Sequence, residues 1–216
     1  MAVNWSDFLA GRRLLEVVQS DYNGELKVVD DLAWGRHVMG GGVTQSGGVA
    51  KKVWKTSLVE IKNLKLNVKN CLILGLGAGS IAELVRKYWP EAKITGVDID
   101  PVIVNLGKKY FSIKEDAVDI HITDAFEYLQ KSKIKCQQLI AVDMYQGQQI
   151  PQKFNTQKFA ALIKSKLGSN GVAVFNRLYS DKKQAEALDF EKKLKKVFGS
   201  VERVYPEANI MFICQK

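Results

Sequence analysis

Apolar and polar residues alternate with two different periods along the chain, and the change of period divides the sequence. Residues 1–48 contain short runs with the strand period of two, and the Asn23-Gly24 pair between two of them is typical of a tight hairpin turn. Between residues 49 and 66 the apolar residues recur at helical spacing instead. Those near one face are Val53, Trp54, Leu58 and Ile61. The pattern predicts a small N-terminal β-hairpin element over 1–48 and a connecting helix within 49–69.

Beyond residue 70, strand-like and helix-like segments alternate. Five apolar strand-like runs are separated by amphipathic helical segments; the runs are CLILG, KITGVDID, VDIHITDA, QQLIAVDMY and GVAVFNRL. The final segment, VERVYPEANIMFICQK, predicts two more strands, paired antiparallel at the sheet edge. Alternating β and α units require a mostly parallel sheet covered by helices on both faces. We therefore expect residues 70–216 to form an α/β domain with a doubly wound, mostly parallel seven-stranded sheet of the Rossmann-like kind.

The composition is typical of a soluble globular protein, with 46% hydrophobic and 25% charged residues. The N-terminal segment lacks the apolar run of a signal peptide, and no apolar stretch reaches the ~18 residues of a membrane span. These features predict a cytoplasmic protein without a membrane partner. The 3 cysteines and 2 histidines are not clustered at ligand spacing, so we predict neither a disulfide framework nor a metal site.

The chain carries a formal net charge of +9, from 32 Lys and Arg against 23 Asp and Glu. Such an excess can mark an acidic partner such as RNA, and it argues against polycationic substrates. The lysines are spread over several segments, however, and a solvated helix face explains the densest run, KKLKKVF. An RNA-binding role would require one patch formed by Lys51, Lys52, Lys55, Lys192 and Lys193.

Glycines or carboxylates follow the first four strands of the predicted sheet. In strand order they are Gly75, Gly77 and Gly79, then Asp98, then Asp124, then Asp143. Ligands of such sheets bind beyond the carboxyl ends of the strands, where the strand order reverses. We therefore expect these residues to share one site.

The glycines have two explanations, because they suit either a ligand that approaches the backbone or a tight strand-to-helix turn. Asp98 lies at the spacing at which a carboxylate binds a ribose diol, and the combination favours a nucleoside-containing ligand. Asp124 can accept a hydrogen bond from an adenine amino group, cap the following helix, or do both, since a cap uses one oxygen. Asp100, which precedes Pro101, is typical of a helix cap.

Two absent motifs narrow the kind of nucleoside. Ser80 stands where the dinucleotide fingerprint G-x-G-x-x-G has its last glycine, and no G-x-x-x-x-G-K-[ST] phosphate loop is present. The arrangement resembles the class I S-adenosylmethionine-dependent methyltransferases, in which the glycine turn and the acids after the second and third strands hold the cofactor. The resemblance implies that S-adenosyl-L-methionine contacts Gly75, Gly77, Gly79, Asp98, Ile99, Asp124 and Ala125.

A looser resemblance spans nearly the whole chain. The segments GVDIDPVIVNLGKKYF, VDIHITDAFEYLQ and QQLIAVDMY are similar to the spermidine synthase branch of that fold, and GGGVTQSG resembles the glutamine-containing turn of its small β domain. This resemblance implies a cofactor contact for Gln45 and a homodimeric assembly. It also implies that Asp143 is the base that deprotonates an attacking amine.

The chain departs from that branch at positions associated with cationic groups. The branch carries G-G-G-D-G at the first turn, and its acid is associated with the aminopropyl amine of the decarboxylated cofactor; this chain has Ala78 there. Gln146 replaces the second acid after the fourth strand, which holds the polyamine. Because a desolvated ammonium needs such partners, these losses favour ordinary S-adenosylmethionine over its decarboxylated form.

We therefore predict a transferase, and favour a methyltransferase of spermidine synthase-like fold that acts on an unidentified small-molecule acceptor. Asp143 is the candidate base and Tyr145 a candidate substrate contact, although Asp143 also suits a cofactor-pocket or turn residue. One alternative is aminopropyl transfer from decarboxylated S-adenosylmethionine to an amine. Another is a non-catalytic family member that binds a nucleoside or RNA.

Overall fold

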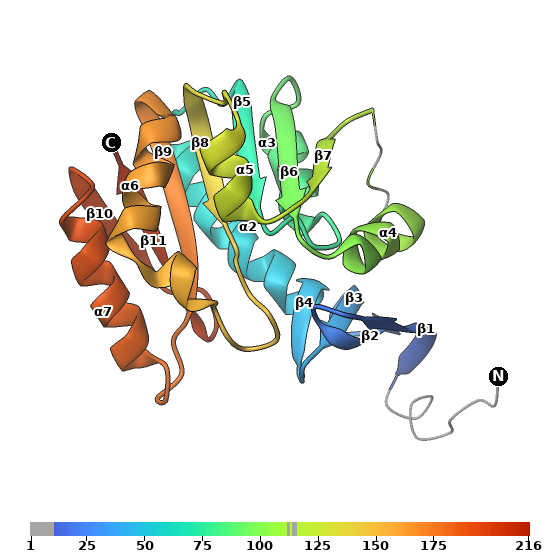
Figure 1. The fold of residues 1–216 in the computed structure, drawn as a ribbon. Coiled ribbons are helices and arrows are strands. Elements are labelled where there is room, and N and C mark those ends of the chain that lie inside the picture. Colours follow the sequence, from blue (N-terminus) through green and yellow to red (C-terminus); the bar gives the residue numbers. More distant parts are fainter. Residues whose placement is uncertain (1–10, 112, 114–115) are drawn as a thin grey trace.

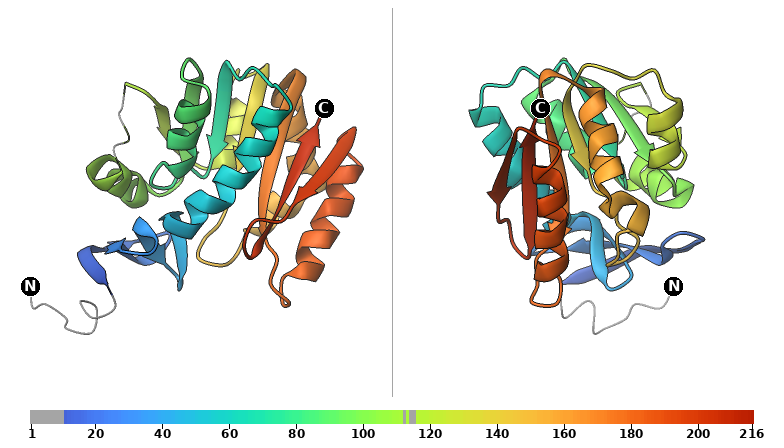
Figure 2. Two further views of the ribbon diagram at one scale, coloured as in Figure 1. Left: turned by 180° about the vertical axis from the view of Figure 1, so that it is seen from behind. Right: turned by 60° about the vertical axis from the view of Figure 1, so that its left-hand side comes forward.

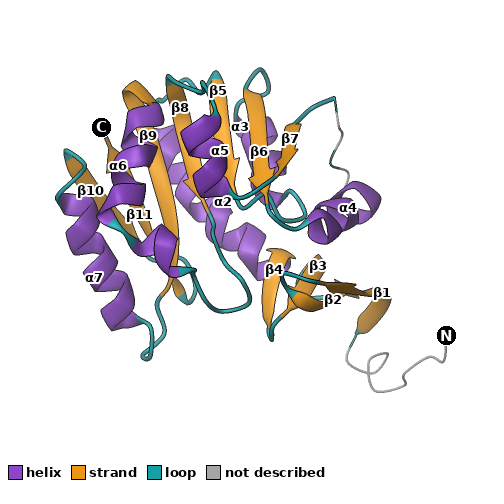
Figure 3. Cartoon of the chain, in the orientation of Figure 1, coloured by secondary structure: helices purple, strands orange, loops and turns teal. Residues whose placement is uncertain are grey.

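The computed structural model describes residues 11–111, 113 and 116–216, and Figure 1 shows their arrangement. The first ten residues of the predicted N-terminal element lie outside the described residues. The described residues form two β-sheets, a four-stranded one and a seven-stranded one. One long helix, α2 (Gly48–Asn63), follows the small sheet and leads to the large one (Figure 3).

The small sheet is antiparallel throughout and has the order β1-β2-β3-β4. Its strands are β1 (Arg12–Ser20), β2 (Gly24–Asp31), β3 (Gly35–Gly40) and β4 (Val43–Gly47). The hairpin predicted around Asn23 and Gly24 is confirmed, although its turn consists of Asp21, Tyr22 and Asn23, and Gly24 already pairs with Ser20. A second hairpin joins β3 to β4. Helix α2 buries Val53, Trp54, Leu58 and Ile61, the face that the apolar spacing predicted.

The large sheet has the order β10-β11-β9-β8-β5-β6-β7. Its strands are β5 (Asn70–Leu74), β6 (Lys93–Asp98), β7 (Asp119–Ile122), β8 (Gln137–Val142), β9 (Leu167–Leu178), β10 (Ser200–Val204) and β11 (Asn209–Gln215). The five strands from β9 to β7 in this order pair in parallel, whereas β10 and β11 are antiparallel at the opposite edge. The chain runs from β5 to β7 on one side and then from β8 onwards on the other, so the strand order reverses between β5 and β8.

Helices cover both faces of the large sheet. They are α3 (Ser80–Tyr88), α4 (Pro101–Tyr110), α5 (Ala125–Lys131), α6 (Gln157–Lys166) and α7 (Gln184–Lys195), with a short 3₁₀ helix, η1 (Gln152–Asn155), before α6. Helices α2, α3 and α4 pack on one face and α5, α6 and α7 on the other (Figure 2). The strands are therefore apolar on both sides. Along β5, Ile73 packs in the hydrophobic cluster beneath α2, α3 and α4, whereas Leu74 packs in the cluster beneath α5, α6 and α7.

This arrangement contradicts the single basic patch that an RNA-binding role would need. Lys51, Lys52 and Lys55 lie on α2, whereas Lys192 and Lys193 lie on α7, on the opposite face of the sheet. Acidic partners also neutralise members of the set, since Lys51 pairs with Glu83 and Lys52 with Glu207. Within the described residues, no helix combines the length and the apolar character required to cross a lipid bilayer.

Candidate functional site

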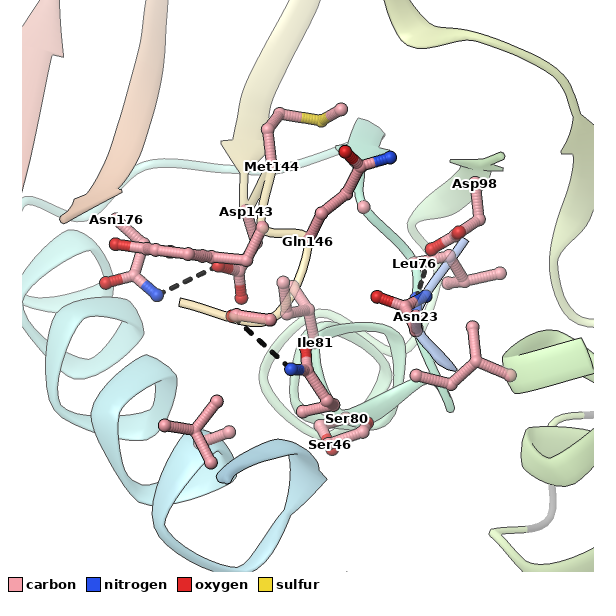
Figure 4. Close-up of a pocket in the computed structure, with 18 of the residues that line it drawn as sticks. Asn23, Ser46, Leu76, Ser80, Ile81, Asp98, Asp143, Met144, Gln146 and Asn176 are labelled. Carbon is pink, nitrogen blue, oxygen red and sulfur yellow. Dashed lines mark hydrogen bonds between the residues drawn. The ribbon is translucent and has the colours of Figure 1, made fainter. Parts of the chain in front are cut away.

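A pocket of about 420 Å³ opens at the carboxyl ends of β5, β6 and β8, where the strand order reverses (Figure 4). This is the place at which α/β sheets of this kind bind their ligands. The small sheet and α2 form the facing wall, through residues such as Asn23, Gln45 and Trp54. The volume falls in the range of small-molecule sites, about 300–1,000 Å³.

The two explanations of the glycine turn, a tight turn and space for a ligand beside the backbone, fit different residues. At Gly75, whose φ is 85°, an added Cβ would lie 2.0 Å from the backbone oxygen of Asp143, so the ends of β5 and β8 touch there. At Gly77, whose φ is 55°, the nearest atom to an added Cβ is Ser46 Oγ at 3.7 Å, so this residue leaves room beside the pocket that it lines. Gly79 packs against the Ile113 side chain instead and does not line the pocket.

Asp98 connects the glycine turn to the start of α4. Its Oδ2 accepts a hydrogen bond from the Gly77 amide at 2.7 Å, and its Oδ1 accepts one from the Asp100 amide at 2.9 Å. Burial raises the pKa of Asp98 from 3.8 to about 6, although the amides that donate to it act in the opposite direction. Asp98 and the neighbouring Ile99 both line the pocket.

Asp124 is the N-cap of α5, which confirms one of its two predicted roles. Its Oδ1 accepts hydrogen bonds from the amides of Phe126 and Glu127, and its Oδ2 forms an ion pair with Lys153 of η1. Both Asp124 and Ala125 line the pocket. An adenine amino group would therefore compete with Lys153 for the second oxygen.

Asp143, directly after β8, is held by two side chains that the sequence did not connect with it. Its Oδ2 accepts a hydrogen bond from Trp54 Nε1 at 2.6 Å. Its Oδ1 accepts one from Asn176 Nδ2 at 2.9 Å, which is drawn in Figure 4. Asn176 is itself held by Asn209, whose Nδ2 donates to Asn176 Oδ1 at 2.7 Å. Burial raises the pKa of Asp143, while the two hydrogen bonds and the nearby Arg177 charge oppose the rise.

The remaining two candidates have structural roles at the pocket wall. The Tyr145 hydroxyl accepts a hydrogen bond from the Leu178 amide at 2.6 Å and so fixes the end of β9. Burial raises the pKa of Tyr145. Gln45 Nε2 donates to the Gly40 carbonyl at 3.0 Å and to the Gly147 carbonyl at 3.4 Å, which joins the β3–β4 turn to the loop after β8. Both side chains also line the pocket.

Ala78 proves to be a core residue. It is fully buried and does not line the pocket, in contrast to its neighbours Leu76 and Gly77. A Cβ added at Gly107 of α4 would lie 2.9 Å from Ala78 Cα, so the backbone of the turn packs tightly on the helix. The missing acid at position 78 therefore has a packing explanation beside the one based on the cofactor, and the choice of cofactor depends on the rest of the pocket.

The pocket residues fit a nucleoside-containing ligand. Gly77 allows close approach to the backbone, Asp98 offers carboxylate oxygens for a diol, and apolar side chains such as Ile99 and Phe154 offer surface for a base. Among the described residues, no group of three or more His, Cys, Asp or Glu is arranged to hold a metal ion. Nine of the ten predicted site residues thus lie around one pocket, and Gly79 lies outside it.

Sequence comparison relates the chain to two kinds of transferase. A model of the spermine/spermidine synthase domain matches residues 40–212, more than half of the chain. A polyamine aminopropyltransferase of Vibrio vulnificus is 32% identical over 114 residues, which are 51% of this chain and 38% of that protein. An eEF1A lysine and N-terminal methyltransferase homolog of Drosophila melanogaster is 29% identical over 143 residues, which are 62% of this chain and 21% of that protein. The chain thus spans less than half the length of these two curated relatives.

Comparison of structures gives the same pair of relationships. The spermidine synthase of Thermotoga maritima superposes with a TM-score of 0.78 at 18% identity, over 94% of this chain and 73% of that one. Human methyltransferase-like protein 13 in complex with SAH superposes with a TM-score of 0.62 at 24% identity, over 77% of this chain and 80% of that one. At these identities the likeness is one of fold. The predicted fold class, a doubly wound α/β sheet with a small N-terminal β element, is confirmed.

Proposed function

Since the chain belongs to the spermine/spermidine synthase family, we propose that it is a transferase that uses S-adenosylmethionine as its group donor. We further propose that it transfers the methyl group, and that the acceptor is a small molecule without ammonium groups. The observation that carries this choice is the charge of the pocket around Asp143.

The cofactor half of the pocket is the part beside the glycine turn. Asp98 would accept hydrogen bonds from the ribose diol, and Gly77 would let the ligand approach the backbone. Asp124 would accept a hydrogen bond from the adenine amino group on the oxygen that Lys153 now contacts. The donor, when bound, supplies a methyl group on a sulfonium centre.

The acceptor half is the part around Asp143. Trp54 and Asn176 each donate a hydrogen bond to one of its oxygens, so the orientation of the carboxylate is fixed. Each oxygen keeps a further lone pair that can accept a proton. A carboxyl with a raised pKa is a stronger base than a free aspartate, and Asp143 takes the proton that the acceptor loses. The protein otherwise aligns the acceptor with the donor.

Carboxamides, rather than carboxylates, surround Asp143. Asn176, Asn209 and Gln146 line this half, and among the described lining residues the other carboxylates are Asp98 and Asp124. Those two are engaged with backbone amides and with Lys153. A polyamine would bring more ammonium groups than this half can neutralise, and a desolvated ammonium without a partner is costly. This charge balance supports methyl transfer over aminopropyl transfer.

Aminopropyl transfer from decarboxylated S-adenosylmethionine is the second candidate. The polyamine aminopropyltransferases among the curated relatives favour it, and Asp143 suits the deprotonation of an amine as well as of another acceptor. The two candidates differ in the donor that the pocket prefers, so donor binding separates them.

Titration calorimetry with the two donors tests the proposal. We expect S-adenosylmethionine to bind more tightly than its decarboxylated form. Tighter binding of the decarboxylated form would favour the second candidate, and binding of neither would contradict any transferase function that uses these donors. Mass spectrometry of a metabolite extract incubated with methyl-labelled donor would then identify the acceptor by its label.

Replacing Trp54 tests the assignment of Asp143 without requiring a known acceptor. Trp54→Phe removes the donor to Oδ2 and keeps an aromatic ring in place, so we expect the pKa of Asp143 to rise further, because the hydrogen bond from Trp54 stabilises the ionised form. Carbon-13 NMR of labelled aspartate carboxyls measures it. Trp89→Phe is the matched control, because Trp89 Nε1 donates to the Leu66 carbonyl, away from the pocket. Equal Asp143 pKa values in both variants would contradict the assignment.

A further inference from the structure

A second, much smaller pocket of about 30 Å³ lies behind the wall of the first one. It is enclosed by the loop after β8, the end of β9 and the beginning of α7, and Tyr145 and Leu178 line both pockets. Figure 1 shows these three segments meeting at the lower end of α7. The charged side chains that line the small pocket are Arg177, Lys183 and Glu186.

Arg177 is a buried cation whose hydrogen bonds all go to neutral groups. It is 4% exposed, and its Nη1 donates to the Asn176 carbonyl at 2.7 Å. Its Nη2 donates to Asn155 Oδ1 at 3.2 Å and to the Phe154 carbonyl at 3.4 Å. The guanidinium lies 3.8 Å from the centre of the Phe190 ring.

The Nε of Arg177 is buried and has no hydrogen-bond partner. Among the described residues, none forms an ion pair with this guanidinium, and Asp143 acts on it only through space. Buried charged groups are normally paired, and buried N–H groups are normally bonded. The side chain therefore lacks one acceptor and one close negative charge.

Two further sources of positive potential face the same pocket. Lys183 is 20% exposed, and its Nζ lies 3.0 Å from Glu186 Oε2 and 3.3 Å from Gln149 Oε1. It is also the N-cap of the 12-residue helix α7, whose first turn has no side-chain cap. The amino end of a helix attracts anions. Glu186 is the opposing charge, and with 67% of its side chain exposed it is held mainly by Lys183.

We propose that this pocket binds one small monovalent anion, of the size of a halide or formate, between Arg177 and Lys183. The anion supplies the negative charge that the Arg177 guanidinium lacks, and it competes with Glu186 for Lys183. The volume is above the roughly 10–15 Å³ that one water requires, and it leaves no room for a group as large as a nucleotide. The lining charges sum to one excess positive charge, from Arg177 and Lys183 against Glu186, which one monovalent anion neutralises.

An anion here acts on the main pocket through the loop that the two share. Gln148 and Ile150 line the small pocket, whereas Gly147 and Pro151 of the same loop line the large one. A mutual pair of backbone hydrogen bonds between Gln146 and Gln149 makes this loop a compact unit. Fixing one side of the unit therefore fixes the other. This inference stands independently of which group the enzyme transfers.

Thermal unfolding of the full chain in sodium bromide, against sodium gluconate at the same concentration, tests the proposal. Gluconate is too large for the pocket, so it matches ionic strength without binding. We expect the unfolding midpoint to rise with the logarithm of the bromide concentration, by a few degrees at about ten times the dissociation constant. Identical midpoints in the two salts at every concentration would overturn the proposal.

Three variants locate the site and remain foldable because their side chains are exposed at least in part. Lys183→Met should weaken bromide binding about tenfold, as the loss of a charge-assisted contact requires. Glu186→Gln should strengthen it about two- to fivefold, because it removes the competing carboxylate. Lys182→Met is the control, since it removes the same charge from a neighbouring residue that does not line the pocket, and it should leave the response unchanged.

Diffraction from bromide-soaked crystals, measured at the bromine absorption edge, gives a direct reading. An anomalous peak in the small pocket between Arg177 and Lys183, together with the midpoint shift, is the expected result. A peak without the shift would indicate an adventitious ion only. That outcome would overturn the proposal, and so would a shift that all three variants keep unchanged.

Discussion

Asp98 is the residue whose protonation state the pocket controls most clearly. Burial raises its pKa to about 6, so its charge changes close to neutral pH. A ribose diol donates hydrogen bonds, and an ionised carboxylate accepts them more strongly than a neutral carboxyl does. Cofactor binding should therefore depend on the ionised form.

We expect the affinity for S-adenosylmethionine to fall about tenfold between about pH 7 and about pH 5, because at one unit below its pKa only about a tenth of Asp98 is ionised. Calorimetry across this range measures the change. Asp98→Asn should bind weakly at both ends and show no such fall. Asp119→Asn is the control, since this carboxylate is 70% exposed on the neighbouring strand β7. A flat pH profile for the unmodified chain would contradict the ribose assignment.

The same raised pKa has an opposite effect on the stability of the free protein. The folded state holds the Asp98 proton more tightly than the unfolded state, so this stabilisation is complete below pH 3.8 and is lost as the pH rises through about 6. The shift corresponds to at most about 3 kcal/mol, and less where pocket water reaches the side chain. Denaturation of the unmodified chain and of Asp98→Asn at several pH values provides a second, cofactor-free readout.

Among the elements, the turn between β5 and α3 contains two glycines, two positions apart, that we expect to have different roles, one in packing and one in ligand binding. Both glycines line the pocket, but Gly75 touches the backbone of Asp143 directly after β8, whereas Gly77 has free space around it. An alanine at either position meets the strain of a positive φ, but only at position 75 does it also collide with another strand.

We expect Gly75→Ala to lower the free energy of unfolding by about 3–5 kcal/mol, because β5 and β8 must separate to admit the methyl group. Gly77→Ala should lower it by only about 1–2 kcal/mol and should instead weaken S-adenosylmethionine binding about tenfold or more. Urea denaturation and calorimetry on the two variants measure these effects. Each variant is the control for the other, and equal losses of stability would show that the turn is not divided in this way.

Sequence patterns were sufficient for most elements because the signals are local. The strands of the large sheet are apolar runs, and the helices between them keep helical spacing. The beginning of β9 was missed because residues 167–171, LGSNG, have the composition of a turn. They are nevertheless extended, with Leu167 opposite Gln137 and a register shift before Val172 pairs with Leu139. The short helix η1 was also missed.

The partners of the site residues could not be predicted in the same way. Trp54 has the helical spacing of a core residue, and it is indeed buried, yet its indole nitrogen reaches Asp143. Nothing local in the sequence connects two residues 89 positions apart. For Asn176 the sequence gives only a weak indication of a role in the site, because this residue follows an apolar strand run at the edge of the sheet where the acids lie. The acids themselves were predictable because topology places strand ends together.

In the whole molecule, the small sheet is tied to the large domain through a buried acid. Asp100 is fully buried, and its Oδ2 accepts hydrogen bonds from Ser20 Oγ and Asn23 Nδ2, each at 2.6 Å. Its Oδ1 caps α4 by accepting from the Val102 amide, which confirms the predicted cap. Asn23 also lines the main pocket, so this junction and the candidate site are continuous.

We expect the double variant Ser20→Ala, Asn23→Ala to lower the free energy of unfolding by about 2–4 kcal/mol, since it leaves a buried carboxylate oxygen without donors. It should also weaken cofactor binding, because the wall formed by the small sheet is no longer fixed. Urea denaturation and calorimetry measure both effects. Thr56→Ala with Ser165→Ala removes two hydroxyls that bond only to their own helices, and it is the control. Equal denaturation midpoints for the two double variants would contradict the role of the junction.

The bond between Trp54 and Asp143 also bears on the order in which the protein folds. One partner lies on α2 and the other after the fourth strand of the large sheet, so the bond closes a long loop of chain. Contacts so distant in sequence form only after the loop-closure entropy has been overcome. The small sheet, with its consecutive hairpins, has mostly local contacts and can form early. The pocket therefore forms late in folding. A bound donor should consequently lower the unfolding rate, whereas its presence should leave the refolding rate unchanged.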